Sequence, residues 1–192
     1  RGGFGVTVAL MKFFQSLDGV EPEQLLELAV HADRLGFEGI TFGDHLVKPV
    51  HYDNIYLYSG DGRPPWDPKS EPEWTAPYVD AWTFAAGIGA RTERLKFLPY
   101  VYVLPMRHPA IVAKQLATAD LFAPGRVLLG AGVGWMREEY ALLGVPFEAR
   151  GARMDEALAV LDGLLAGGDF GFEGRHFRVP TCRMEPVPEQ RI

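Results

Sequence analysis

Asp44 and His45 are the residues of this sequence whose types and position are best suited to chemistry. They directly follow the apolar run Gly39–Gly43, which is typical of a buried strand. In parallel α/β folds the active site lies at the carboxyl ends of the strands. An imidazole there can exchange a proton near neutral pH, and a carboxylate beside it can accept a hydrogen bond from a cofactor ring. We therefore predict that Asp44 and His45 are catalytic; the alternative is an Asp that only caps a loop turn.

A glycine-rich string, Gly130 to Trp135, follows another apolar run at 127–130. Glycines at such a place let a ligand approach the backbone closely. A Rossmann dinucleotide loop would instead follow the first strand, with an acidic residue about 20 positions further on. The first predicted strand lacks that pattern, so we favour a barrel-type site. The sequence also lacks the G-x-S-x-G nucleophile elbow and the G-x-x-x-x-G-K phosphate loop.

The remaining histidines do not have the spacing of metal ligands. None of His31, His51, His108 and His176 forms an i, i+4 pair with a third ligand nearby. We therefore predict no metal site. Cys182 is the only cysteine, which precludes an internal disulfide and suits a reducing cytoplasm.

Strands and helices alternate along the chain that must position these residues. Apolar runs predict strands over 4–10, 39–43, 95–104 and 127–130, and helical periodicity predicts helices over 22–35, 77–91, 109–123, 138–143 and 154–165. Gly36 falls where a left-handed helix cap is expected. A small hairpin is predicted at about 170–179, around Gly174. This order predicts one domain over 1–192, with a parallel sheet covered by helices.

Periodicity alone leaves two architectures open, a doubly wound open sheet and a closed barrel. Four strand–helix units are half of an eightfold barrel, and half a barrel leaves sheet edges and an apolar face to be covered. The residues at 186–192 resemble a connection to a fifth strand. We therefore expect that the sequence stops partway through a longer product.

A long segment at about 47–76 interrupts the alternation. It is rich in aromatic residues, namely Tyr52, Tyr56, Tyr58, Trp66 and Trp74. Long segments without periodicity are usually functional or disordered, and the aromatic content argues against disorder. We predict a lid or a substrate pocket of apolar or aromatic character; the alternative is an ordered surface insertion.

The charge distribution excludes several classes of partner. The net charge is −6 and no basic cluster follows one helix or strand, so nucleic-acid binding is not expected. No signal peptide is evident at the start, and no apolar stretch is long enough to cross a bilayer. We expect a cytoplasmic protein that binds a small molecule.

Several segments together resemble the luciferase-like flavin and deazaflavin oxidoreductases, most of all the branch of coenzyme F420-dependent oxidoreductases. The similar segments occur in the same order as in that family and cover nearly the whole chain: 32–37, 43–45, 92–95, 104–109, 113–118, 125–127, 132–139, 150–156 and 172–174.

The resemblance implies a (β/α)8 TIM barrel, of which this chain carries the first four strand–helix units. It implies coenzyme F420, or alternatively FMN, and a homodimer. Asp44 would then touch the cofactor ring, and His45 would face the reacting carbon or the substrate. The family's bulged third strand, whose non-proline cis peptide lies behind the cofactor ring, would fall at Val101–Tyr102, close to Leu104, so these three residues would bind the cofactor. The cofactor's side chain or ring edge would be lined by Val133, Gly134 and Arg137.

Two positions depart from the family pattern. Trp135 stands where the F420-dependent glucose-6-phosphate dehydrogenases have a Glu that acts as an acid, and Trp cannot exchange protons. This departure argues against the sugar-phosphate reaction. Pro99–Tyr100 replaces a common Gly-Thr, and the Tyr is positioned to crowd or stack on the ring.

These observations lead to one functional hypothesis and two alternatives. The first is F420-dependent hydride transfer to or from a small organic substrate. The second is an FMN-dependent monooxygenase that uses molecular oxygen. The third is a non-catalytic flavin-binding barrel or an inactive fragment.

Overall fold

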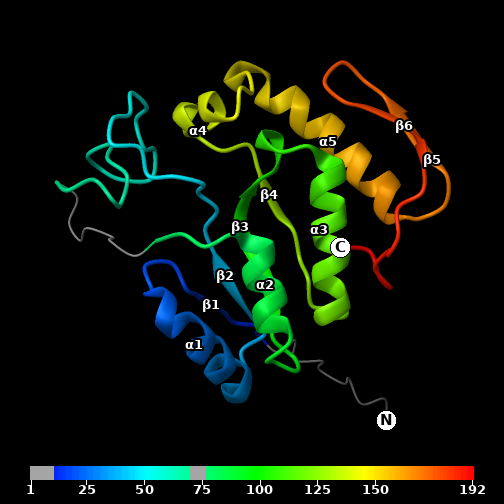
Figure 1. Cartoon of the computed structure of the whole chain (residues 1–192). Coiled ribbons are helices and arrows are strands. Elements are labelled where there is room, and N and C mark those ends of the chain that lie inside the picture. The colour runs from blue at the N-terminus through cyan, green and yellow to red at the C-terminus, as the bar shows by residue number, and fades with distance from the viewer. Residues whose placement is uncertain (1–10, 70–76) are drawn as a thin grey trace, which may run out of the picture.

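The structure is a computed structural model that describes residues 11–69 and 77–192. Four parallel strands form one sheet in chain order: β1 (Phe14–Ser16), β2 (Gly39–Phe42), β3 (Lys96–Val103) and β4 (Gly130–Gly132) (Figure 1). The strand predicted at 4–10 lies outside the described residues. Strand β1 was not predicted, and the parallel order of the predicted strands that correspond to β2, β3 and β4 is confirmed.

The connections are helical, as predicted. The α-helices are α1 (Pro22–Leu35), α2 (Ala81–Gly89), α3 (Pro109–Phe122), α4 (Arg137–Leu142) and α5 (Arg150–Leu165), and short 3-10 turns η1 (Leu104–Met106) and η2 (Phe147–Ala149) precede α3 and α5. Helix α1 ends at Gly36 in the left-handed conformation with φ 83°, as the sequence predicts.

Two helices differ from the prediction by more than one residue at their N-terminal ends. Helix α2 begins at Ala81 rather than Pro77, because the side chain of Asp80 accepts a hydrogen bond from the backbone N–H of Thr83 and caps the helix there. Helix α5 begins at Arg150, earlier than the predicted 154, because it continues directly from η2.

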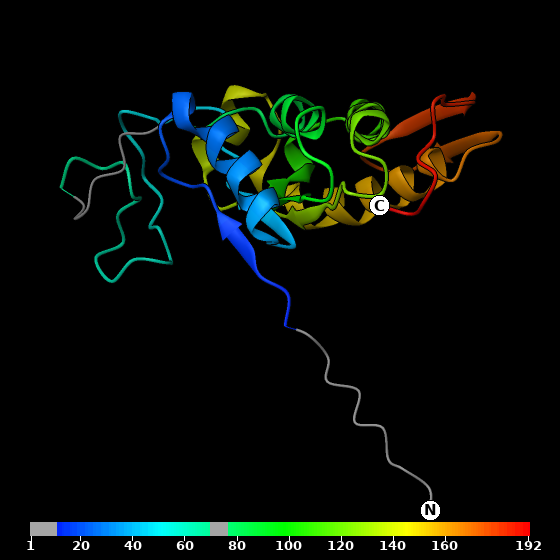
Figure 2. The same cartoon turned by 90° about the horizontal axis from the view of Figure 1, so that it is seen from below.

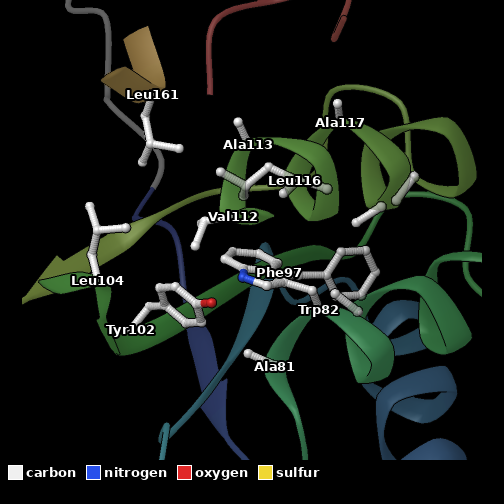
Figure 3. Packing of buried hydrophobic residues seen from close by; sticks show 14 of the residues in the cluster. Ala81, Trp82, Phe97, Tyr102, Leu104, Val112, Ala113, Leu116, Ala117 and Leu161 are labelled. Atoms are coloured by element: carbon white, nitrogen blue, oxygen red, sulfur yellow. The ribbon is translucent and has the colours of Figure 1, made fainter. Parts of the chain in front are cut away.

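The core lies between the sheet and the helices on one of its faces. Helices α2 and α3 pack against each other on this side of the sheet (Figures 1 and 2). Figure 3 shows Phe97 and Tyr102 of β3 among Trp82 of α2 and Leu116 of α3, all of them buried. In contrast, Tyr100 in the middle of β3 is 69% exposed.

The fourth strand lies further along the chain than predicted. Val127 makes only an isolated bridge to Phe97, and the β4 ladder runs over Gly130–Gly132 instead of 127–130. The glycines extend the strand because the chains approach closely: a Cβ at Gly130 would lie 2.4 Å from the carbonyl oxygen of Pro99.

The predicted bulge of β3 is present, but its irregular peptide bond lies one position earlier than predicted. The non-proline cis peptide joins Tyr100 to Val101, so the prediction of Val101–Tyr102 is wrong. The pairing shows the reason, because Tyr100 pairs with Gly130 and Tyr102 with Ala131. Val101 is thus the extra residue of the bulge, and the cis bond is on its N-terminal side.

The predicted hairpin is confirmed as β5 (Phe170–Glu173) and β6 (Arg178–Cys182), which pair antiparallel. The carboxylate of Glu156 on α5 holds its turn by accepting the N–H groups of Arg175, His176 and Phe177 at 2.8–3.0 Å. Within residues 11–69 and 77–192, no helix combines the length and apolar character that a membrane span requires.

Candidate active site

A pocket of about 200 Å³ lies at the carboxyl ends of all four parallel strands. Asp18 follows β1, His45 follows β2, Val101 lies near the end of β3, and Trp135 follows β4, and all four line this pocket. Strand ends are where parallel α/β folds place their active sites. The structure therefore brings the predicted Asp44 and His45 to the expected edge of the sheet.

His45 is held from one side by a buried carboxylate. Its Nδ1 lies 3.1 Å from Oε2 of Glu139, which is only 2% exposed. Oε1 of the same carboxylate accepts the backbone N–H groups of Leu46 at 2.6 Å and Val47 at 3.4 Å. Glu139 thus fixes both the imidazole and the backbone that follows it.

Aromatic rings surround the imidazole on its other sides. The ring centroid of His45 lies 4.8 Å from Trp66, 4.9 Å from Tyr78 and 6.2 Å from Trp135, each in an edge-on arrangement. Burial raises the pKa of the Tyr78 phenol above its ordinary value, so this hydroxyl stays protonated near neutral pH. The result is an imidazole in an apolar, aromatic setting.

Asp44 has a different set of partners. Its two oxygens each lie 2.6 Å from a nitrogen of the Arg107 guanidinium, and Oδ2 also accepts the N–H of Val103 at 2.8 Å. Burial of Arg107 opposes its charge, but the Asp44 carboxylate outweighs this and raises the pKa of the guanidinium. Asp44 therefore forms a buried ion pair that ties the end of β2 to the end of β3. A contact between Asp44 and a cofactor ring stays a prediction.

The floor of the pocket is suited to a flat ring. Val101 and Gly134 line it, and Val101 is 37% exposed although apolar. Gly134 has φ 69°, and a Cβ there would lie 2.5 Å from Cγ1 of Val103, so this position has no room for a side chain. A pocket lined by these two residues and by aromatic side chains fits the ring of a flavin or a deazaflavin.

Four of the residues predicted to bind the cofactor do not line this pocket. Tyr102 is buried against Trp82, with ring centroids 5.1 Å apart, and Leu104 is buried in the core. Tyr102 faces the helices because neighbouring strand residues point to opposite faces of the sheet, and Leu104 lies beyond the strand, in η1. Val133 uses its carbonyl to accept a hydrogen bond from Tyr140, and Arg137 pairs with Glu148 over the Phe147 ring.

Sequence reasoning missed Glu139 and Arg107 as parts of the site. Glu139 lies in the first turn of α4, directly after the glycine-rich string. A carboxylate so soon after a strand end was the available signal, but nothing in the spacing pairs it with His45, 94 residues earlier. Arg107 falls in a segment that was noted only for its family resemblance. In the described ranges, no cluster of three or more His, Cys, Asp or Glu side chains is placed to hold a metal ion.

The aromatic insertion contributes directly to the pocket. Tyr56 and Tyr58 line it, and Trp66 is buried beside His45. Glu138 of α4 anchors the insertion by accepting the N–H of Asp53 at 2.8 Å and the side-chain amide of Asn54 at 3.1 Å. Trp74 lies outside the described residues.

Comparisons with known proteins identify similar sequences and structures. The family described as luciferase-like monooxygenase matches residues 5–192. An uncharacterized protein of Mycobacterium tuberculosis is 37% identical over 168 residues, which are 87% of this chain and 56% of that protein. The F420-dependent glucose-6-phosphate dehydrogenase of Nocardia farcinica is 31% identical over 182 residues, which are 92% of this chain and 48% of that enzyme.

A solved structure agrees with the fold. The crystal structure of monooxygenase RslO1 from Streptomyces bottropensis superposes with a TM-score of 0.74 at 27% identity, over 94% of this chain and 51% of that one. The chain thus spans about half the length of the relatives it matches. The prediction of a luciferase-like TIM barrel, represented here by four strands, is confirmed.

Proposed function

The chain belongs to the luciferase-like monooxygenase family, and from this premise we propose that it is part of a coenzyme F420-dependent oxidoreductase. The reaction is hydride transfer to or from a small organic substrate. The likeness to the F420-dependent dehydrogenase of Nocardia farcinica supports the choice of cofactor.

The observation that carries the proposal is the position of His45. This imidazole lines a pocket at the strand ends, with its Nδ1 on a buried carboxylate and aromatic rings around it. An imidazole so placed can hold or accept a proton at the substrate while the surrounding rings exclude water.

The residues at the pocket floor fit the proposed cofactor. Val101 and Gly134 would lie against the ring, and Asp44 would keep the two strand ends in place through Arg107 and Val103. When bound, the deazaflavin supplies a carbon centre that carries the two-electron chemistry. The protein's own task is to orient this ring, to exclude water and to handle the proton at His45.

The identity of the residue at position 135, a tryptophan, restricts the class of substrate that we expect. Trp135 lines the pocket 6.2 Å from the His45 ring, between centroids, and packs 5.0 Å from Tyr56. Indole cannot act as an acid, so we expect that a sugar phosphate is not the substrate. The aromatic walls favour an apolar or aromatic molecule.

An FMN-dependent monooxygenase is the second candidate function. The likeness to the monooxygenase from Streptomyces bottropensis favours it, because that structure is 27% identical over nearly the whole chain. The same apolar floor accommodates an isoalloxazine ring. The two candidates differ in their use of oxygen, since only the monooxygenase consumes it during turnover.

The test is a pair of fluorescence titrations, one with coenzyme F420 and one with FMN, under identical conditions. Tighter binding of F420, with substrate oxidation or reduction that proceeds without oxygen uptake, is the expected result. Tighter binding of FMN together with oxygen uptake coupled to turnover would overturn the proposal in favour of the monooxygenase.

A further inference from the structure

We propose that Glu139 is the positioning residue of the site: it fixes His45 as the tautomer that carries its hydrogen on Nδ1, so that Nε2 is the nitrogen offered to the pocket. The consequence for reaction rate rests on the function proposed above. The tautomer itself does not, because it follows from contacts within the chain.

Both oxygens of the Glu139 carboxylate have partners in the segment that contains His45. Oε1 accepts two backbone N–H groups, of Leu46 and Val47, and Oε2 faces Nδ1 of His45 at 3.1 Å. The carboxylate is 2% exposed, so water does not compete for these contacts. The segment directly after His45 therefore anchors Oε1 of the carboxylate, and Oε2 faces the imidazole.

The chemistry of the carboxylate decides which nitrogen of the His45 imidazole carries the hydrogen. An ionised carboxylate is only an acceptor, so the atom facing it must be a donor. Nδ1 of the neutral imidazole must then carry the hydrogen, and Nε2 is left with a lone pair. Within the described ranges, Nε2 has no hydrogen-bond partner of its own.

The other buried carboxylate of the site, that of Asp44, is not available for this task. Asp44 precedes His45 in the sequence, but Arg107 occupies both of its oxygens at 2.6 Å. The rings of Trp66 and Tyr78 pack edge-on within 5 Å of the imidazole centroid and hold its plane. Glu139 is thus the carboxylate that sets both the orientation and the tautomer.

The test begins with a measurement that needs no substrate or cofactor. Long-range ¹H–¹⁵N correlation spectra of the protein distinguish the two neutral tautomers of a histidine, and loss of one signal set in His45→Ala assigns it. We expect His45 to be the Nδ1–H tautomer. The Nε2–H tautomer in the unsubstituted protein would overturn the proposal.

A matched pair of variants then tests the cause. Glu139→Gln keeps the size and lets the amide oxygen accept from Leu46, which turns the amide NH2 toward His45. Nδ1 then becomes an acceptor, and we expect the spectrum to change to the Nε2–H tautomer. Glu138→Gln is the control, since Glu138 is its neighbour on α4 but binds Asp53 and Asn54 instead of His45. An unchanged tautomer in Glu139→Gln, or an equal change in Glu138→Gln, would overturn the proposal.

Steady-state kinetics test whether the tautomer of His45 affects the rate of the proposed reaction. In a histidine–carboxylate pair the wrong tautomer is costly, so we expect Glu139→Gln to lower kcat by about 10²-fold or more, with KM changed by less than about threefold. Because Glu139 acts through His45, the double variant with His45→Ala should be no slower than His45→Ala alone. Additive losses would mean that Glu139 acts separately. If the protein turned over no substrate with F420, the proposed function would fail while the spectra still decided the tautomer.

Discussion

The two ends of the sheet each bury a polar cluster, and the clusters are built differently. At the amino ends of the strands, Arg126 donates to Oγ1 of Thr92 and to the carbonyl of Gly89, both at 2.8 Å, and to the carbonyls of Leu95 and Phe122 at 3.3 Å. At the carboxyl ends, His45 meets Glu139 beside an open pocket. In the amino-end cluster, the Arg126 guanidinium is engaged by fixed partners. The carboxyl-end cluster instead contains a titratable imidazole, that of His45, which lines a pocket.

This difference separates residues that support the fold from those suited to chemistry. Burial lowers the pKa of the Arg126 guanidinium, but an arginine side chain still keeps its positive charge at working pH and does not release a proton. An imidazole with one nitrogen held and the other uncommitted can take and release a proton. In barrels, the amino-end face generally serves stability and the carboxyl-end face serves function. Substitutions in each cluster test whether the two clusters can be separated in this way.

The largest expected effect is on the rate, at the carboxyl ends. His45→Ala should lower kcat by at least about 10²-fold, because it removes the group that handles the proton. The free energy of unfolding should change by only about 1 kcal/mol, since Glu139 keeps its bonds to Leu46 and Val47. Steady-state kinetics and urea denaturation measure the two quantities.

The control for this change is His31→Ala, which removes an exposed imidazole from α1. It should leave both kcat and the urea midpoint unaltered. Retention of turnover within a few-fold in His45→Ala would show that the carboxyl-end cluster is not the site of proton transfer.

Most of the helices and strands could be predicted from the sequence, but only some of the site residues could. Helix α1 with its Gly36 cap, helix α3 and the hairpin were predictable because their signals are local. The segments that resemble the family could not be divided, from the sequence alone, into those that support the fold and those that form the site. The structure shows that 92–95 and 125–127 belong to the amino-end cluster.

The pairs at the carboxyl ends were beyond sequence reasoning for a physical reason. His45 and Glu139 are 94 residues apart, and Asp44 and Arg107 are 63 apart. Only the parallel sheet brings them together, and periodicity does not specify which side chains meet across it. The same limit explains why Tyr102 was assigned to the pocket, since the bulge at Val101 decides which residues of β3 face it.

The second effect is on stability, at the amino ends. Arg126→Met keeps the length of the side chain but leaves Thr92 and the buried carbonyls of Gly89 and Leu95 without their donor. Buried acceptors that lose their partner are costly, so the free energy of unfolding should fall by about 3 kcal/mol. Urea denaturation measures this loss, and the Kd for the cofactor should stay within about twofold.

Arg91→Met provides the comparison, because it makes the same substitution at an exposed position next to this cluster. It should change the free energy of unfolding by less than about 0.5 kcal/mol. If Arg126→Met instead weakened cofactor binding as much as it weakened the fold, the two ends of the sheet would not be separable.

The smallest effect concerns the pH dependence of the carboxyl-end side. Burial raises the pKa of Tyr140 from 10.0 to about 12, and its hydroxyl donates to the carbonyl of Val133 at 2.6 Å. The folded state thus holds this proton more tightly than the unfolded state does. The resulting stability is complete below pH 10 and is lost as the pH rises from 10 to about 12.

Tyr140→Phe should therefore cost about 1 kcal/mol at neutral pH, and this cost should shrink as the pH rises through that window. Urea midpoints at several pH values between 8 and about 11.5 measure the difference between the two proteins. Tyr58→Phe removes a hydroxyl from a residue that is 80% exposed, so its midpoint should follow the unsubstituted protein at every pH. A constant gap between Tyr140→Phe and the unsubstituted protein would mean that this phenol is not among the groups whose ionisation unfolds the carboxyl-end side. Its hydrogen bond would then act as a fixed contact, as those of Arg126 do at the opposite end.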